Sequence, residues 1–298
     1  MRIIPAYLFI FIIMGLTLAL LPKQGGFIWQ PEFIVTLSAL LFTLLVYLVG
    51  HIAHTNKTTT GIIGTAVFIL LFCPESYKFF YRDEIAIMEL FSICIVPFFI
   101  SQYNRISTKD FKYGYFLMLL MGIFCSYTHD SITIPLCLSF LMLSYLQRER
   151  LFRLACWPMV IGFVIGTTLA ILKSAYFNSA IFHNWHMLSC HTTDGLTQLW
   201  ETKVFIFAVL TTIYFLISKQ RRTLLLHIFH HQKLLTYCLL FSFCAIPFAP
   251  LGLDNAISGV SFFCMFWVLI LCHHLMEQFR NRHIRKTNQF NEMETPNH

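Results

Sequence analysis

A histidine and an acid stand side by side between two apolar stretches of this chain. The segment "CSYTHDSITIPLCL" runs from Cys125 to Leu138 and carries His129 and Asp130 at its centre. A carboxylate in this position can act as a general base that deprotonates an acceptor hydroxyl. The neighbouring His129 can stabilise a leaving phosphate as a cation. The alternative interpretation is that Asp130 caps a helix, but capping gives His129 no role.

A second group of ionic residues belongs to the segment "PESYKFFYRDE" and the stretch just after it. The candidate catalytic carboxylates here are Asp83, Glu84 and Glu89. Lys78 and Arg82 are candidates for binding a substrate phosphate, since both carry donors for charged oxygens. Glu89 is flanked by apolar residues, and a charge inside a membrane span usually faces a cavity or a partner. The alternatives are an interfacial aromatic belt for the segment and a protonated packing role for Glu89.

The longest polar connection, from about residue 174 to 202, contains "FHNWHMLSCHTTDG". Trp185 and His186 are further candidates for substrate binding. Trp185 could equally anchor a re-entrant loop at the membrane interface. The histidine spacing matches no specific ligand motif, so we predict no metal site. The sequence does not specify a cofactor or a metal dependence, and it leaves open a disulfide between Cys73 and Cys190.

The composition shows which solvent surrounds the elements that position these residues. Of the 298 residues, 57% are hydrophobic and only 12% are charged. Soluble domains carry about 25% charged residues, so this chain has too little polar surface for one. The apolar runs are too long and too uniform for the alternating strands of a barrel. We therefore predict an all-α, polytopic transmembrane bundle.

Hydropathy and helix-breaking residues predict ten spans. Their approximate bounds are 3–22, 33–53, 61–74, 85–101, 114–128, 131–147, 155–173, 203–218, 234–250 and 256–275. Residues 1–276 then form one membrane domain. The polar segment 277–298 is expected to be a disordered cytoplasmic tail.

The distribution of Lys and Arg predicts the orientation of the bundle. Ten spans place 16 of these residues on one side and 5 on the other, so both termini are expected in the cytoplasm. The candidate acids then lie at the outer face, apart from Glu89 within a span. Topology and anionic lipid explain the basic inner side, and no nucleic-acid partner is predicted.

The segment from Cys125 to Leu172 resembles a family of uncharacterised bacterial multi-pass proteins. That family is grouped with GT-C-type glycosyltransferases, which use polyprenyl-phosphate-linked sugars. It carries a His-Glu pair at the head of a span, then a basic turn and a helix that ends in Gly-Thr. The corresponding features here are His129 with Asp130, the basic turn 148–153, and Gly166 with Thr167.

This resemblance implies a glycosyltransferase, or a relative that has lost the activity, at the outer face of the bacterial cytoplasmic membrane. Its substrate would be a polyprenyl-linked sugar, used in assembly of envelope polysaccharide or glycolipid. The alternatives are a polysaccharide polymerase, a transporter of small molecules or lipids, and a non-catalytic membrane scaffold. Donor, acceptor, protein partners and oligomeric state are not specified by the sequence.

Overall fold

The fold was analysed in a computed structural model of the chain. The structure describes residues 3–20, 31–73, 80, 87, 90–91, 93–94, 96–98, 100–101, 119–120, 122–123, 130–146, 157–158, 160–166, 168–169, 194–246 and 253–294. Within these residues the regular structure is helical throughout. The predicted all-α fold class is therefore confirmed for the part of the chain that is described.

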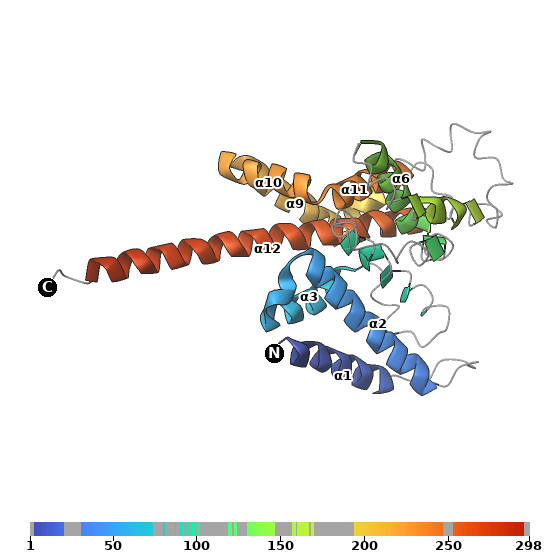
Figure 1. The fold of residues 1–298 in the computed structure, drawn as a ribbon, viewed down its shortest axis with the longest axis horizontal. Helices are drawn as coiled ribbons and strands as arrows, with labels where there is room; N and C mark the ends of the chain where they lie inside the picture. Colours follow the sequence, from blue (N-terminus) through green and yellow to red (C-terminus); the bar gives the residue numbers. More distant parts are fainter. Residues whose placement is uncertain are drawn as a thin grey trace.

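The described ranges contain eight labelled α-helices (Figure 1) and one short 3₁₀ helix. Their bounds are α1 (Ile4–Leu20), α2 (Pro31–Ile52), η1 (Thr55–Lys57), α3 (Thr59–Phe72), α6 (Asp130–Leu146), α9 (Lys203–Ile217), α10 (Lys219–His231), α11 (Lys233–Ala245) and α12 (Leu253–Glu294). Each of these α-helices except α10 coincides with a predicted span to within a few residues, α12 continuing beyond its span. α10 covers the basic stretch between two predicted spans.

Two of the helices are long and apolar enough to cross a membrane, Glu32–Ile52 and Ile257–Arg280. A third span results if Asp194–Glu201 and Lys203–Ile217, which meet at 81°, count as one broken helix. Several described helices are apolar but only 10–17 residues long, α1 and α3 among them. The described residues thus show two or three candidate spans.

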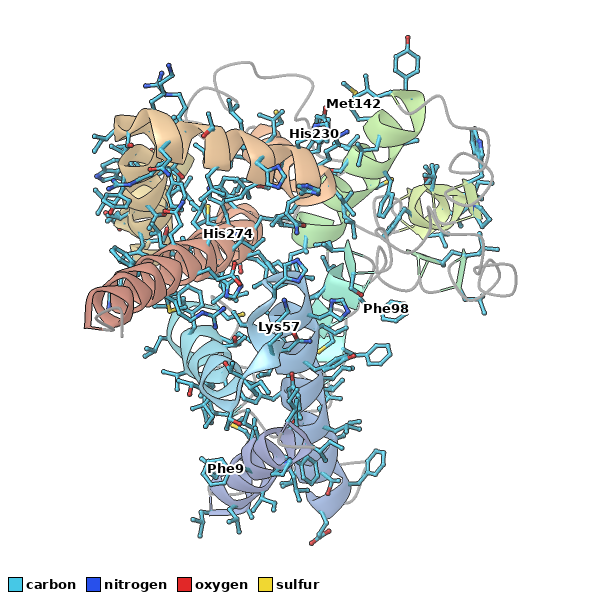
Figure 2. The ribbon with its side chains drawn as sticks, turned by 60° about the vertical axis from the view of Figure 1, so that its left-hand side comes forward. Phe9, Lys57, Phe98, Met142, His230 and His274 are labelled. Carbon is cyan, nitrogen blue, oxygen red and sulfur yellow. The ribbon has the colours of Figure 1, made fainter. Side chains whose placement is uncertain are left out.

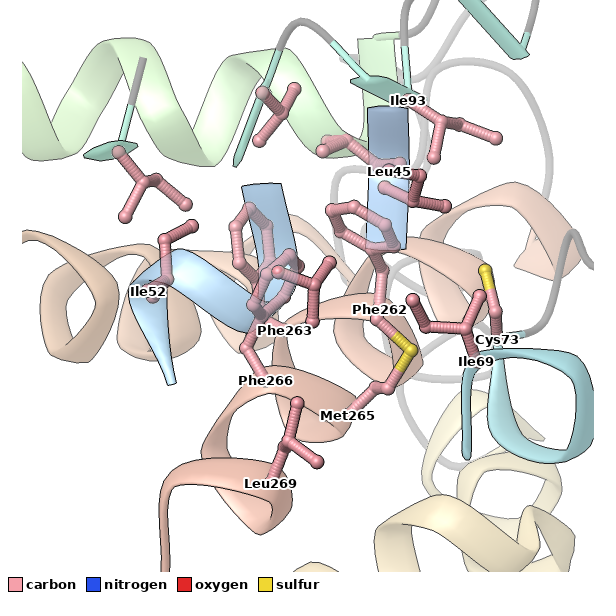
Figure 3. Packing of buried hydrophobic residues seen from close by; sticks show 14 of the residues in the cluster. Leu45, Ile52, Ile69, Cys73, Ile93, Phe262, Phe263, Met265, Phe266 and Leu269 are labelled. Carbon is pink, nitrogen blue, oxygen red and sulfur yellow. The ribbon is translucent and has the colours of Figure 1, made fainter. Parts of the chain in front are cut away.

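α12 is the central helix of the bundle. Every side chain from Val260 to Leu271 is at most 7% exposed. A helix that is apolar on all sides lies either in a protein core or in lipid, and here the low exposure shows that protein surrounds it. α12 contacts α9, α11, α6 and α3. Figure 3 shows Phe262 and Phe266 of α12 in one apolar cluster with Leu45 of α2 and Ile69 of α3.

α1 shows how the outside of the bundle meets its surroundings. Its buried residues recur every fourth position, namely Ala6, Ile10, Met14 and Leu18. The remaining faces are also apolar, and Leu16 is 60% exposed. In water, an exposed apolar surface of this kind would promote aggregation, whereas lipid solvates it. Exposed leucine, isoleucine and phenylalanine side chains also occur on α2, α3 and α9. This distribution is that of a membrane-associated protein.

Residues 277–294 are helical, whereas a disordered tail was predicted for 277–298. α12 runs without interruption to Glu294 and extends well beyond the other helices (Figure 1). No glycine or proline occurs between Val260 and Glu294, so the backbone meets no helix breaker there. The next breaker is Pro296, which disfavours helical backbone at the residue before it.

Candidate functional site

Nearly all the site residues predicted from the sequence lie outside the described residues. These are Lys78, Arg82, Asp83, Glu84, Glu89, His129, Trp185 and His186. Asp130 is the first residue of α6, and its side chain also lies outside the description. The structure therefore neither brings these residues together nor separates them. α6 itself begins at Asp130.

The described residues gather a different group of ionic side chains, where α2 ends beside α12. We call this group the basic cluster. It consists of His51, His54, Lys57, His227, His273, His274 and Arg280, with the single carboxylate of Glu277. Figure 2 shows Lys57 beneath α12 and His274 on α12 itself.

A tight turn between α2 and α3 presents the first part of the cluster. His54 adopts the left-handed conformation with φ 58°, the one such non-glycine residue among those described. Buried Thr55 then shares a 2.7 Å hydrogen bond with Thr65 of α3. The hydroxyl of Thr58 accepts a hydrogen bond from the Gly61 backbone N–H at 3.1 Å and so caps α3. These contacts fix the direction of the turn, so His54 is held at a defined place on the surface.

α12 supplies the second part of the cluster, just after its fully buried stretch. His273 Nε2 lies 3.5 Å from Glu277 Oε1, and His274 Nδ1 lies 4.0 Å from Glu277 Oε2. The exposed fractions of these side chains are 14% for His273, 27% for His274 and 37% for Glu277. The carboxylate is thus shared between two histidines, and all three groups are only partly accessible to water.

α10 supplies the third part of the cluster, His227. Its Phe229 ring packs against Trp267 of α12 with 4.8 Å between the ring centroids. The turn before α10 is fixed by Arg221, whose guanidinium lies 3.9 Å from the centre of the Tyr214 ring. This seating brings His227 within electrostatic reach of His274. Three elements far apart in the sequence therefore contribute to one cluster.

The electrostatics of the cluster follow from its composition. Burial lowers the pKa of His54, and the nearby charges of Lys57 and His273 lower it further, whereas Glu277 acts in the opposite direction. Lys57 and His54 remain solvent-exposed, so the cluster is open to solutes. Within the described residues no group of histidine, cysteine and acid side chains has the geometry of a metal site. A surplus of cationic donors suits an anion with several oxygens.

This cluster was not predicted from the sequence. One signal was present, because His51, His54, His273 and His274 all fall at or next to the ends of predicted spans. Hydropathy, however, does not state which span ends are neighbours.

Comparison of the chain with family models, with curated proteins and with solved structures gives no match. Function therefore has to be inferred from the residues of the chain and their arrangement.

Proposed function

We propose that the chain is a ten-span protein of the bacterial cytoplasmic membrane with both termini in the cytoplasm. Support comes from the exposed apolar faces of α1, α2, α3 and α9 and from the 16-to-5 partition of Lys and Arg. This orientation places the start of α6 at the outer face. It places the basic cluster, at the ends of α2 and α12, at the inner face.

The proposed activity is transfer of a sugar from a polyprenyl-phosphate carrier to an acceptor at the outer face, for envelope polysaccharide or glycolipid. One observation supports this proposal: the apolar helix α6 begins at Asp130, and His129 directly precedes Asp130 in the sequence. An acid and a cation at the head of a span are the two groups that the reaction needs at the water boundary. The resemblance of the segment Cys125–Leu172 to GT-C-type proteins points the same way.

The reaction assigns a role to each candidate residue. Asp130, Glu89, Asp83 or Glu84 takes the proton of the acceptor hydroxyl. The acceptor oxygen then bonds to the anomeric carbon of the sugar as the bond from that carbon to the phosphate oxygen breaks. His129, Lys78 or Arg82 stabilises the negative charge on the departing polyprenyl phosphate. Trp185 and His186 bind the sugar from the long outer connection.

The test is to replace the acid isosterically in the native host and profile the surface glycans. Asp130→Asn and His129→Ala should each remove a glycan, whereas Asp130→Glu should retain part of it. Asp254→Ala is the matched control, because Asp254 lies in the first turn of α12 and is also predicted at the outer face. Unchanged glycans in D130N at normal protein level would overturn the proposal. Equal loss in D254A would point to a general effect on folding.

Orientation needs its own measurement. An engineered thiol in T128C should react with a membrane-impermeant maleimide in intact cells, and one in N297C only after lysis. Both variants require a background without reactive native cysteines, Cys244 above all because it is exposed. The opposite pattern of labelling would place the His129–Asp130 pair in the cytoplasm and end the proposal.

A further inference from the structure

We infer that the basic cluster is a binding site for a phosphate group, at the face where α2 ends and α12 leaves the bundle. The inference is independent of the proposed transferase, whose candidate residues lie at the opposite face. It concerns only residues that the structure describes.

Basic side chains outnumber acidic ones in the basic cluster. Lys57 and Arg280 both lie within electrostatic reach of His273, and Glu277 is the one described acid that reaches the same group. His51 interacts electrostatically with His54, and His227 interacts electrostatically with His274. A bound anion would favour protonation of the histidines and turn each of them into a donor. Protonated without an anion, the same histidines would repel one another.

The basic cluster is built on rigid parts of the fold, α12 and the turn after α2. His273 and His274 follow directly on the fully buried stretch of α12, so their backbone cannot move independently of the core. His54 is held by the Thr55–Thr65 hydrogen bond in the turn after α2. Donors on rigid elements bind an anion without a large ordering cost.

His54 adopts an uncommon backbone conformation. A left-handed φ of 58° is unfavourable for a side chain with a Cβ, and glycine would fill the position at lower cost. Histidine here places an imidazole on the open side of the cluster, beside Lys57. Residues held in costly backbone conformations are concentrated at functional sites.

A phosphate group could come from two sources, the headgroup of an anionic lipid or a solute in the surrounding water. The chemistry of recognition is the same, namely cationic donors around several oxygens. The neighbouring apolar surface of the bundle favours a lipid, whose headgroup would lie level with the ends of α2 and of the buried part of α12. The experiment below separates the two sources.

The test uses the purified full chain in nanodiscs of phosphatidylcholine. Inorganic phosphate is titrated in one arm, with binding followed by calorimetry and by the chemical shifts of isotope-labelled histidine. In the other arm the discs contain phosphatidic acid, and the shifts and the thermal unfolding temperature are compared with those in phosphatidylcholine alone. Saturable shifts in the first arm identify a general phosphate site. Shifts that occur only in the second arm identify a lipid headgroup site.

Three variants decide whether the cluster is responsible. Lys57→Gln changes an exposed side chain, and His54→Gln changes the turn; each should weaken binding roughly tenfold. His230→Gln is the matched control, because His230 is exposed in the last turn of α10 and does not act on His54, His273 or His274. H230Q should bind like the wild type.

The inference is overturned if neither arm shows binding, or if K57Q and H54Q bind as tightly as the wild type. It is also overturned if H230Q loses as much affinity as they do, since that result would show attraction by overall positive charge. K57Q guards against a folding artefact, because Lys57 contributes nothing to the buried core.

Discussion

Thr55 and Thr65 join the turn after α2 to the middle of α3 through a 2.7 Å hydrogen bond between their side-chain hydroxyls. Both residues are buried, and Thr65 also donates to the Gly61 carbonyl at 2.8 Å. A buried hydroxyl that lacks a hydrogen-bond partner destabilises the folded protein by more than one such hydrogen bond stabilises it. The pair therefore fixes the turn that carries His54 and Lys57, and with it the shape of the basic cluster.

Thr65→Val should lower the free energy of unfolding by about 1 kcal/mol, because it leaves the Thr55 hydroxyl with only a 3.5 Å contact to the Gly50 carbonyl. The double variant T55V/T65V should cost less than the sum of the two single variants. A double-mutant cycle from reversible unfolding in detergent measures this coupling. Thr17→Val, on an exposed face of α1, is the control and should have little effect. Strict additivity would mean that the hydroxyls do not interact.

Two glycines of α3 should respond in opposite ways to alanine. A Cβ on Gly61 would overlap the carbonyl oxygen of Thr55, whereas a Cβ on Gly64 would meet nothing within 4 Å. Gly61→Ala should therefore destabilise the protein by about 1–3 kcal/mol. Gly64→Ala should be neutral or stabilising by up to about 1 kcal/mol, because alanine is the better helix former. Thermal unfolding of both variants checks the pair, and equal effects would contradict the close turn.

Acidification should destabilise the protein through His54. Its pKa is lowered in the folded state by burial and by Lys57, so the unfolded chain binds this proton at a higher pH than the folded protein does. Stability from this group is present above the ordinary histidine pKa of about 6.5 and is lost as the pH falls through that value toward the folded pKa. His54→Asn should flatten the slope on the acid side, measured as unfolding temperature against pH without phosphate. His230→Asn should leave the slope unchanged.

Phosphate should reverse that dependence if the basic cluster binds it. An anion between the histidines favours their charged forms. Phosphate itself gains a proton in this range, so sulfate, whose charge stays constant, is the probe here, and its affinity should rise as the pH falls from 7.5 to 6.0. Calorimetric titrations at the two pH values measure the change. H54N should show a smaller rise than the wild type. An affinity that is independent of pH would exclude the histidines from the contact.

The outer face of α1 should lie in lipid. Leu16 is 60% exposed and Leu18 is fully buried, two residues apart on the same helix. A nitroxide spin label at position 16 should be accessible to oxygen and protected from a water-soluble nickel reagent, as lipid-facing sites are. A label at position 18 should be protected from both. Access of the nickel reagent to position 16 would place α1 in water and remove this support for a membrane bundle.

The positions of the helices could be predicted from the sequence, because apolar runs and their breakers are local signals. Predicted spans such as 33–53 and 203–218 coincide with α2 and α9. The sequence predicts ten membrane crossings. Among the described helices, two or three are long and apolar enough to cross a membrane. The continuation of α12 to Glu294 was missed, because the polarity of 277–298 was taken as evidence of disorder although no helix breaker occurs before Pro296.

The neighbours of each helix were decided by the tertiary structure alone. His54 and His273 are more than two hundred residues apart in the sequence, yet they lie in one cluster. Hydropathy does not predict which helices are neighbours, because lipid solvates an apolar face as well as another helix does. The neighbour is selected by the packing of particular side chains. The sequence by itself determined most of the described helices, α10 and the end of α12 excepted, and showed that the chain is suited to a membrane. The tertiary structure alone decided that the end of α2 lies near the end of the buried part of α12. It also decided that His54, in the turn beside them, adopts a left-handed backbone conformation.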